Sequence, residues 1–190
     1  MKFLLCAVNA KYIHSNPAVY SLRAYAGAEL GKHVELAEYT INHAFTEVLA
    51  DIYKRKPDVI GFSCYIWNIG MVWELVTELR KLMPQVPVWL GGPEVSYDAD
   101  KLLAEHPEVT GVMVGEGEET FRELLSYYVE KEERRRATED TCVDADAGLW
   151  TSFDEELSGI KGLCLPTGHT LSRDLADLNR LPFLYEETVS

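Results

Sequence analysis

Hydrophobic and polar positions follow a regular order along the chain, in which short apolar runs are separated by longer stretches of helical periodicity. Five of these runs predict strands, because they are short, largely apolar and bounded by polar residues or glycine. The run at 59–63, VIGFS, is apolar almost throughout, which is typical of a parallel strand covered on both faces. The five predicted strands are at 2–8, 33–39, 59–63, 86–90 and 111–114.

Helices are predicted between the strands, where apolar residues recur three and four positions apart. The first begins after Asn16, a capping residue type, with Pro17 at the first helical position, and it ends at Gly31. Asn68 is a candidate cap for the helix that follows the third strand. Further helices are predicted at 44–54, at 99–105 and around 121–128.

Five strand–helix alternations within about 130 residues imply right-handed crossovers and a parallel sheet. We therefore expect an α/β fold of the flavodoxin-like (Rossmann-like) type, with a doubly wound five-stranded parallel sheet in three α/β/α layers. We expect residues 1–130 to form this domain. Residues 131–158 are rich in charge and are expected to be flexible. Residues 159–190 predict a small hairpin around Pro166-Thr167-Gly168 and then a linker.

Net charge and cysteine spacing exclude several classes of function. The chain has 18 Lys and Arg against 31 Asp and Glu, a net charge of −13, so general binding to nucleic acid or anionic membranes is not expected. Its beginning lacks a signal-peptide pattern and no apolar stretch is long enough to span a membrane, which predicts a cytoplasmic protein. The four cysteines form no CxxC or CxxxCxxC motif, so their spacing indicates neither a metal cluster nor a disulfide scaffold.

Ligands of open α/β sheets bind at the carboxyl ends of the strands. Here these ends lead into the segments 9–16, 63–68, 91–97 and 115–119, which hold aromatic residues and glycines. Gly115-Glu116-Gly117 lacks the third glycine of a dinucleotide motif and brings carboxylates that would repel a pyrophosphate. Ser63 stands where a phosphate-receiving domain needs aspartate, and neither Ser63 nor Cys64 lies in a nucleophile-elbow pattern. A large, flat, mostly uncharged ligand, held by stacking and backbone hydrogen bonds, fits these segments best.

Four segments at this edge resemble a known family. The sequences NAKYIHSN at 9–16, GFSCY at 61–65, GGPEVS at 91–96 and VGEGE at 114–118 are similar to the cobalamin (B12)-binding domain that precedes the catalytic domain of B12-dependent radical SAM proteins. The resemblance covers residues 1–128. The sequence RLPF at 180–183 resembles the link into the radical SAM barrel of such proteins, whose CxxxCxxC motif is missing here. This favours a lone or truncated binding domain.

The resemblance implies roles for individual residues. Gly91 and Gly92 would flank the nucleotide tail of cobalamin, and Ser63, in an S-x-L pattern with Tyr65 in place of the leucine, would hydrogen-bond near it. His14 would be the cobalt ligand, although the orienting aspartate of the family's D-x-H-x-x-G loop is replaced by Tyr12. The full set of implied cofactor-binding residues is Asn9, Tyr12, His14, Ser15, Asn16, Ser63, Cys64, Tyr65, Trp67, Gly91, Gly92, Pro93, Glu94, Gly115, Glu116 and Gly117.

The function implied is a cobalamin-binding module without catalytic residues of its own. It would hold B12 for a C-terminal radical SAM domain of the same parent protein, which would use a 4Fe–4S cluster and S-adenosylmethionine for methyl transfer or a related radical modification. Two alternatives stay open. One is a flavodoxin-like interaction or sensory domain without a corrin, in which Tyr12, Tyr65 and Trp67 only pack loops onto the sheet and Glu116 and Glu118 only favour a helix N-terminus. The other is half of a flavin- or nucleotide-sugar-binding enzyme.

Overall fold

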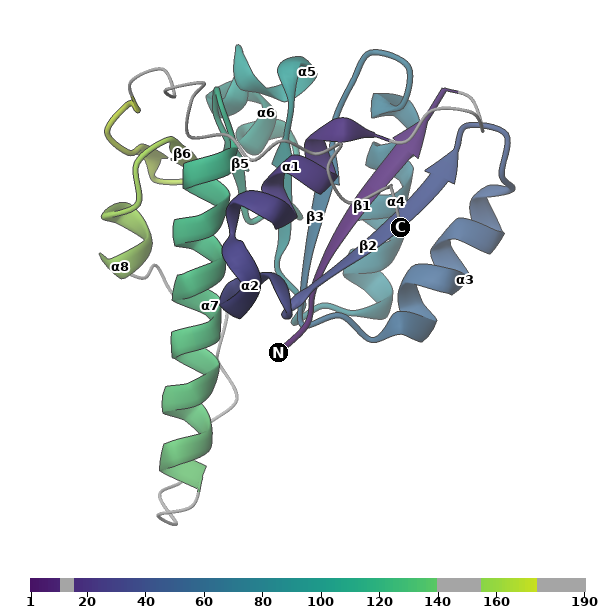
Figure 1. Ribbon diagram of the computed structural model, residues 1–190. Coiled ribbons are helices and arrows are strands. Elements are labelled where there is room, and N and C mark those ends of the chain that lie inside the picture. Colours follow the sequence, from purple (N-terminus) through teal and green to yellow (C-terminus); the bar gives the residue numbers. More distant parts are fainter. Residues whose placement is uncertain (11–15, 140–154, 174–190) are drawn as a thin grey trace, which may run out of the picture.

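The computed structural model describes residues 1–10, 16–139 and 155–173 of the protein. Its strands form one sheet in the order β2-β1-β3-β4-β5-β6-β7 (Figure 1). β1 to β5 are parallel, whereas β6 and β7 are antiparallel to their neighbours. The strands are β1 (Phe3–Asn9), β2 (Val34–Thr40), β3 (Val59–Ser63), β4 (Val88–Gly91), β5 (Gly111–Met113), β6 (Leu163–Leu165) and β7 (Gly168–His169).

The five parallel strands have the 2-1-3-4-5 order of flavodoxin-like sheets, which confirms the predicted fold class. The expected strand number is wrong, because the sheet has seven strands and not five. The C-terminal hairpin joins the sheet through the pairs Val112–Cys164 and Met113–Leu163. All three residues of β6 are buried, so the hairpin covers the edge that β5 would otherwise expose.

Helices cover both faces of the parallel strands and complete the three layers (Figure 1). One core cluster packs the sheet against α3, α4, α5 and α6, and the other packs it against α1 and α7. The helices are α1 (Pro17–Tyr25), α2 (Gly27–Gly31), α3 (Phe45–Arg55), α4 (Ile69–Leu82), α5 (Pro93–Ser96), α6 (Ala99–Glu105), α7 (Glu118–Glu139) and α8 (Glu155–Ser158).

Local sequence signals explain the boundaries of the first two helices. Asn16 caps α1 as predicted, with its side chain accepting a hydrogen bond from the Ala18 amide at 3.1 Å. The predicted helix to Gly31 is divided in two at Gly27, whose φ of +75° interrupts the helical backbone. The charged segment after residue 130 continues α7 to Glu139, and residues 140–154 lie outside the described ranges. None of the helices in the described ranges is both long and apolar enough to cross a lipid bilayer.

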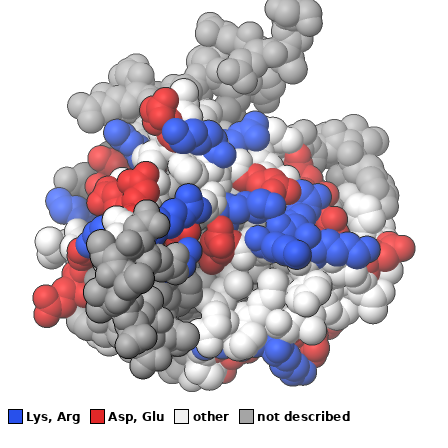
Figure 2. Space-filling view, turned by 90° about the horizontal axis from the view of Figure 1, so that it is seen from below, with Lys and Arg blue, Asp and Glu red and all other residues white. Residues whose placement is uncertain are grey.

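The amino ends of the strands carry side chains of both charge signs, which lie next to one another in Figure 2. Arg55 bonds Glu35 through Nη1 at 2.5 Å and Asp51 through Nε at 2.8 Å, and Lys2 lies 3.1 Å from Glu35. Burial alone would raise the pKa of Glu35, but the hydrogen bonds from Lys2 and Arg55 outweigh it and hold that pKa below its usual value. For Asp51, the bonds from Tyr39 and Arg55 outweigh burial in the same way and lower its pKa.

Replacing Arg55 with methionine is expected to lower the free energy of unfolding by about 1 kcal/mol at pH 7, because two partly exposed ion pairs are lost. The carboxyl pKa values are depressed in the folded state. The stabilisation is therefore present above their unfolded values, near pH 4, and is lost as the pH falls through the folded values. Urea unfolding of the Arg55→Met variant and of the unchanged protein, at pH 7 and at about pH 3, measures the difference in their free energies of unfolding. A difference that does not shrink in acid would contradict the ion-pair explanation.

Candidate functional site

A cavity of about 130 Å³ lies at the carboxyl ends of β1, β3, β4 and β5, on the face covered by α1 and the start of α7. It is next to the point between β1 and β3 where the strand order reverses, which is where ligands bind in flavodoxin-like folds. Its walls are mostly apolar, with the hydroxyl-bearing residues Ser63 and Tyr65, one carboxylate and four glycines. The lining residues are Leu5, Ala18, Val19, Leu22, Phe62, Ser63, Tyr65, Gly91, Gly92, Met113, Gly115, Gly117 and Glu118.

Two adjacent glycines at the end of β4 shape one wall of this cavity. Gly92 has a φ of +113°, and a Cβ there would lie 2.5 Å from the carbonyl oxygen of Cys64, so only glycine fits. The Cys64 amide donates to the Gly91 carbonyl at 2.7 Å, which fixes the turn after β3 against the turn after β4. The nearest atom to a Cβ at Gly91 would be the flexible end of Met113, at 3.4 Å, with the Cβ and carbonyl oxygen of Met113 at ordinary contact distances of 3.7 and 3.9 Å. The protein's own backbone thus requires Gly92, while the absence of a side chain at Gly91 leaves space in the cavity.

Ser63 brings an aliphatic hydroxyl to the cavity wall, at the last position of β3. Its Oγ is 3.3 Å from Asn16 Nδ2, and the side chain of Asn16 is itself held as the cap of α1. Because the amide nitrogen donates in this contact, the hydroxyl hydrogen of Ser63 remains able to donate to an acceptor in the cavity. The arrangement suits a flat, largely apolar group that offers one hydrogen-bond acceptor.

Asn68 holds together the backbone segments next to the cavity, a role that the sequence alone did not reveal. It stands at the N-cap position of α4 as predicted, but its side chain makes no capping bond. It is fully buried, accepts from the Tyr65 amide at 2.8 Å, and donates to the carbonyls of Ser63 at 2.8 Å and Val8 at 3.0 Å. A buried amide that satisfies three backbone groups fixes the ends of β1 and β3 at the cavity.

Large apolar side chains are exposed around the same end of the sheet. Ile66 is 77% exposed and Tyr97 92%, and they follow β3 and β4 respectively. Trp67 stacks on Tyr65 with ring centroids 4.5 Å apart and donates from Nε1 to the Val8 carbonyl at 3.3 Å. Ile41, after β2, adds to this apolar rim. Exposed apolar groups gathered at one end of a domain are typical of a surface that another group covers.

The predicted site residues are distributed unevenly around the cavity. Six of them line it: Ser63, Tyr65, Gly91, Gly92, Gly115 and Gly117. Asn16 contacts Ser63 behind the wall, Asn9 bonds Glu38 at 2.9 Å, and Cys64 is buried in the core, where burial raises the pKa of its thiol to about 12. Trp67, Pro93, Glu94 and Glu116 are not among the lining residues. Tyr12, Ser15 and the proposed cobalt ligand His14 lie outside the described residues.

Most of the apolar lining was absent from the sequence-based prediction. Val19 and Leu22 face the cavity from α1, and Leu5 and Met113 face it from β1 and β5. Glu118 enters at the start of α7 and accepts a hydrogen bond from Ser21 at 3.0 Å, which joins α7 to α1. Helical spacing predicts the helix, but it does not indicate which of its apolar residues reach a cavity.

A family model described as the B12 binding domain matches residues 4–125, more than half of the chain. The cobalamin-dependent radical SAM methyltransferase TokK of Streptomyces tokunonensis is 38% identical over 71 residues, and the 2-(S-pantetheinyl)-carbapenam-3-carboxylate methyltransferase of Streptantibioticus cattleyicolor is 39% identical over 69 residues. These matches cover 37% and 36% of this chain, but only 10% of each relative.

Among solved structures, the cobalamin-dependent S-adenosylmethionine radical enzyme OxsB in its apo form has a similar fold. The TM-score is 0.64 at 14% sequence identity, and the likeness covers 95% of this chain and 23% of the other.

Proposed function

Since the chain belongs to the B12 binding domain family, we propose that it binds cobalamin at the carboxyl ends of its parallel strands and presents it to a radical SAM catalytic domain. The observation that carries this proposal is the cavity at the reversal of strand order, with Ser63 and the glycines in its wall. The resemblance of the GGPE and GEGE segments and the radical SAM relatives support it.

The residues present fit the nucleotide tail of cobalamin, which ends in a flat, largely apolar dimethylbenzimidazole. Leu5, Val19 and Met113 provide apolar walls, and Ser63 provides a donor for a ring nitrogen or a neighbouring oxygen. The missing side chain at Gly91 keeps the entrance open beside β4. When bound, cobalamin would supply a cobalt centre that carries a methyl group or an electron, and this chain's residues would hold and orient it.

The exposed apolar side chains at the carboxyl ends of the strands support the second part of the proposal, in which the bound cobalamin faces a catalytic domain. A corrin ring lying over the strand ends would cover Trp67 and Ile66, and a catalytic domain above it would cover Tyr97. The chain covers a tenth of its curated relatives' length, which leaves room in such proteins for the further domain. The parent protein would, on this proposal, transfer a methyl group or make a related radical modification with S-adenosylmethionine and a 4Fe–4S cluster.

Reconstitution with hydroxocobalamin tests the proposal directly. The apoprotein is mixed with excess hydroxocobalamin and passed through gel filtration, and the visible spectrum of the protein peak is recorded. We expect a red protein with close to one cobalamin per chain. A colourless peak whose thermal midpoint is unchanged by hydroxocobalamin would reject the proposal and favour a flavodoxin-like interaction domain without a corrin.

Ser63→Ala is expected to weaken hydroxocobalamin binding about fivefold, the equivalent of one neutral hydrogen bond of about 1 kcal/mol. Equilibrium dialysis against hydroxocobalamin measures the dissociation constant. Ser126→Ala is the matched control, because Ser126 bonds Glu130 on the exposed face of α7 and does not line the cavity. Equal affinity of Ser63→Ala and the unchanged protein would exclude a direct bond from this hydroxyl.

A further inference from the structure

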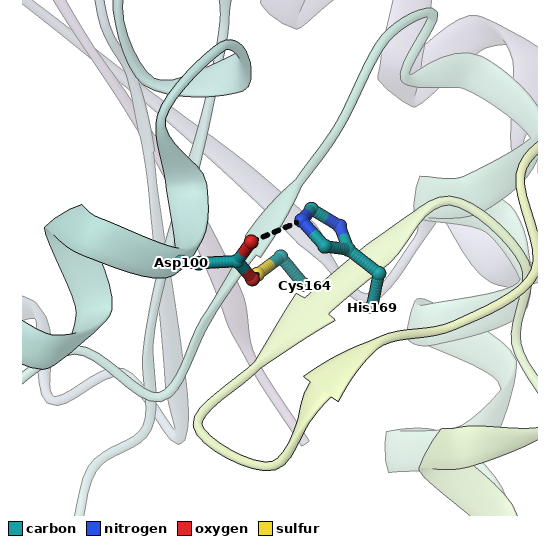
Figure 3. A group of neighbouring side chains, drawn as sticks. All are labelled: Asp100, Cys164 and His169. Carbon is teal, nitrogen blue, oxygen red and sulfur yellow. Dashed lines mark hydrogen bonds and ion pairs between the residues drawn. The ribbon is translucent and has the colours of Figure 1, made fainter.

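Three potential metal ligands converge where the C-terminal hairpin meets the start of α6 (Figure 3). Asp100 Oδ2 is 3.0 Å from His169 Nε2, and Cys164 Sγ is 3.2 Å from Asp100 Oδ1. All three ligand atoms lie within 4.8 Å of one another. The residues come from α6, β6 and β7, and none of them lines the cavity described above.

We propose that Asp100, Cys164 and His169 form a Zn²⁺ site that fastens the β6–β7 hairpin to α6. A thiolate, an imidazole and a carboxylate are the three ligand types that zinc takes in proteins, and a water completes the tetrahedron. Bond lengths of about 2.0–2.3 Å place the ligand atoms of tetrahedral zinc roughly 3.5 Å apart. The two hydrogen-bonded spacings, 3.0 and 3.2 Å, lie slightly below this value and the third is at most 4.8 Å, so small side-chain rotations are sufficient.

The surroundings of the three side chains suit an ion that enters from one side. Cys164 is fully buried and closes the bottom of the cluster, whereas Asp100 and His169 are exposed and open to solvent. Without metal, burial and then the bond to Asp100 raise the pKa of the Cys164 thiol to about 12, so it keeps its proton. On zinc binding, the sulfur would release this proton to solvent and take the metal in its place.

Simple hydrogen bonding is the alternative explanation of the cluster, and it predicts little effect on stability. The pair between His169 and Asp100 is largely exposed, and such pairs contribute about 0–1 kcal/mol. The hairpin is also short, because β7 has only two residues. A metal that joins Asp100 to Cys164 and His169, which are 64 and 69 positions further along the chain, would instead hold this hairpin firmly on the sheet.

Zinc titration of the chelator-stripped chain, without cobalamin, tests the inference independently of the proposed function. We expect one Zn²⁺ per chain by calorimetry, with a dissociation constant of about 1 μM or tighter, and a rise in the thermal midpoint. His169→Gln is expected to weaken binding about 100-fold. Asp98→Asn is the matched control, since Asp98 is exposed two residues before Asp100 and outside the cluster. No binding of Zn²⁺ at 100 times that concentration would overturn the inference.

Cobalt substitution identifies the sulfur ligand. Co²⁺ added to the metal-free chain is expected to give a near-ultraviolet sulfur-to-cobalt charge-transfer band, which Cys164→Ala removes and Asp98→Asn retains. Because Cys164 is buried, circular dichroism first establishes that the Cys164→Ala chain is folded. If it is not, the exposed His169→Gln variant decides the question alone. A band that survives Cys164→Ala, or zinc binding unaffected by His169→Gln, would place the metal elsewhere.

Discussion

Gly91→Leu is expected to abolish hydroxocobalamin binding while leaving the chain folded. A Cβ at this position comes no closer than 3.4 Å to its nearest neighbour, Met113, and its backbone is not in the left-handed region, so the fold tolerates a side chain. The rest of the leucine would extend into a cavity of about 130 Å³ and occupy the space that we propose for the nucleotide tail. Gel filtration with hydroxocobalamin should yield a colourless protein, a loss of affinity of about 100-fold or more.

Gly70→Leu controls for the change of residue type, because Gly70 is exposed on α4 and a Cβ there has open space around it. This control should bind hydroxocobalamin like the unchanged chain. Unchanged binding by Gly91→Leu, in a chain with a normal thermal midpoint, would show that the tail does not enter this cavity.

Asn68→Asp is expected to lower the free energy of unfolding by about 3 kcal/mol at pH 7, a fall of roughly 6–12 °C in the thermal midpoint. The carboxylate keeps the acceptor for the Tyr65 amide but loses both donors. A buried negative charge then faces the carbonyl oxygens of Val8 and Ser63.

The penalty in this variant should depend on pH with a definite sign. The introduced carboxyl is more easily ionised in the unfolded chain, so its folded pKa is raised and the penalty grows as the pH rises. Urea unfolding at pH 4 and pH 7 should therefore show the larger loss at pH 7. Asn42→Asp, at an exposed position, serves as the control and should change stability little at either pH. A loss at Asn68 no greater than at Asn42 would contradict the bridging role.

The parallel core was predictable because its strands are short apolar runs between amphipathic helices. The VIGFS run is β3 without any change of bounds, and Asn16 with Pro17 began α1 as expected. The number of strands was not predictable in the same way. LCL at 163–165 is too short to reveal that it pairs with β5 across some fifty residues of intervening chain. Long-range pairing of short strands leaves no periodicity to read.

The glycine turns of the candidate site were predictable from the sequence, whereas the contacts of its side chains were not. Glycine pairs after strands mark turns that approach other groups, which pointed to Gly91 and Gly92. Asn68 resembled a helix cap, and only the fold shows that its amide faces inward to two strand ends. The cluster of Asp100, Cys164 and His169 had no motif, since its members are far apart in sequence.

The edge strand supplied by the hairpin determines how much of this chain forms a self-sufficient unit. A version cut at residue 125, where the family match ends, would lose β6 and leave β5 with open backbone groups and uncovered apolar surface. Such an edge invites pairing between molecules and precipitation. A version of the domain transplanted into another protein therefore has to include residues 155–173 together with the parallel core.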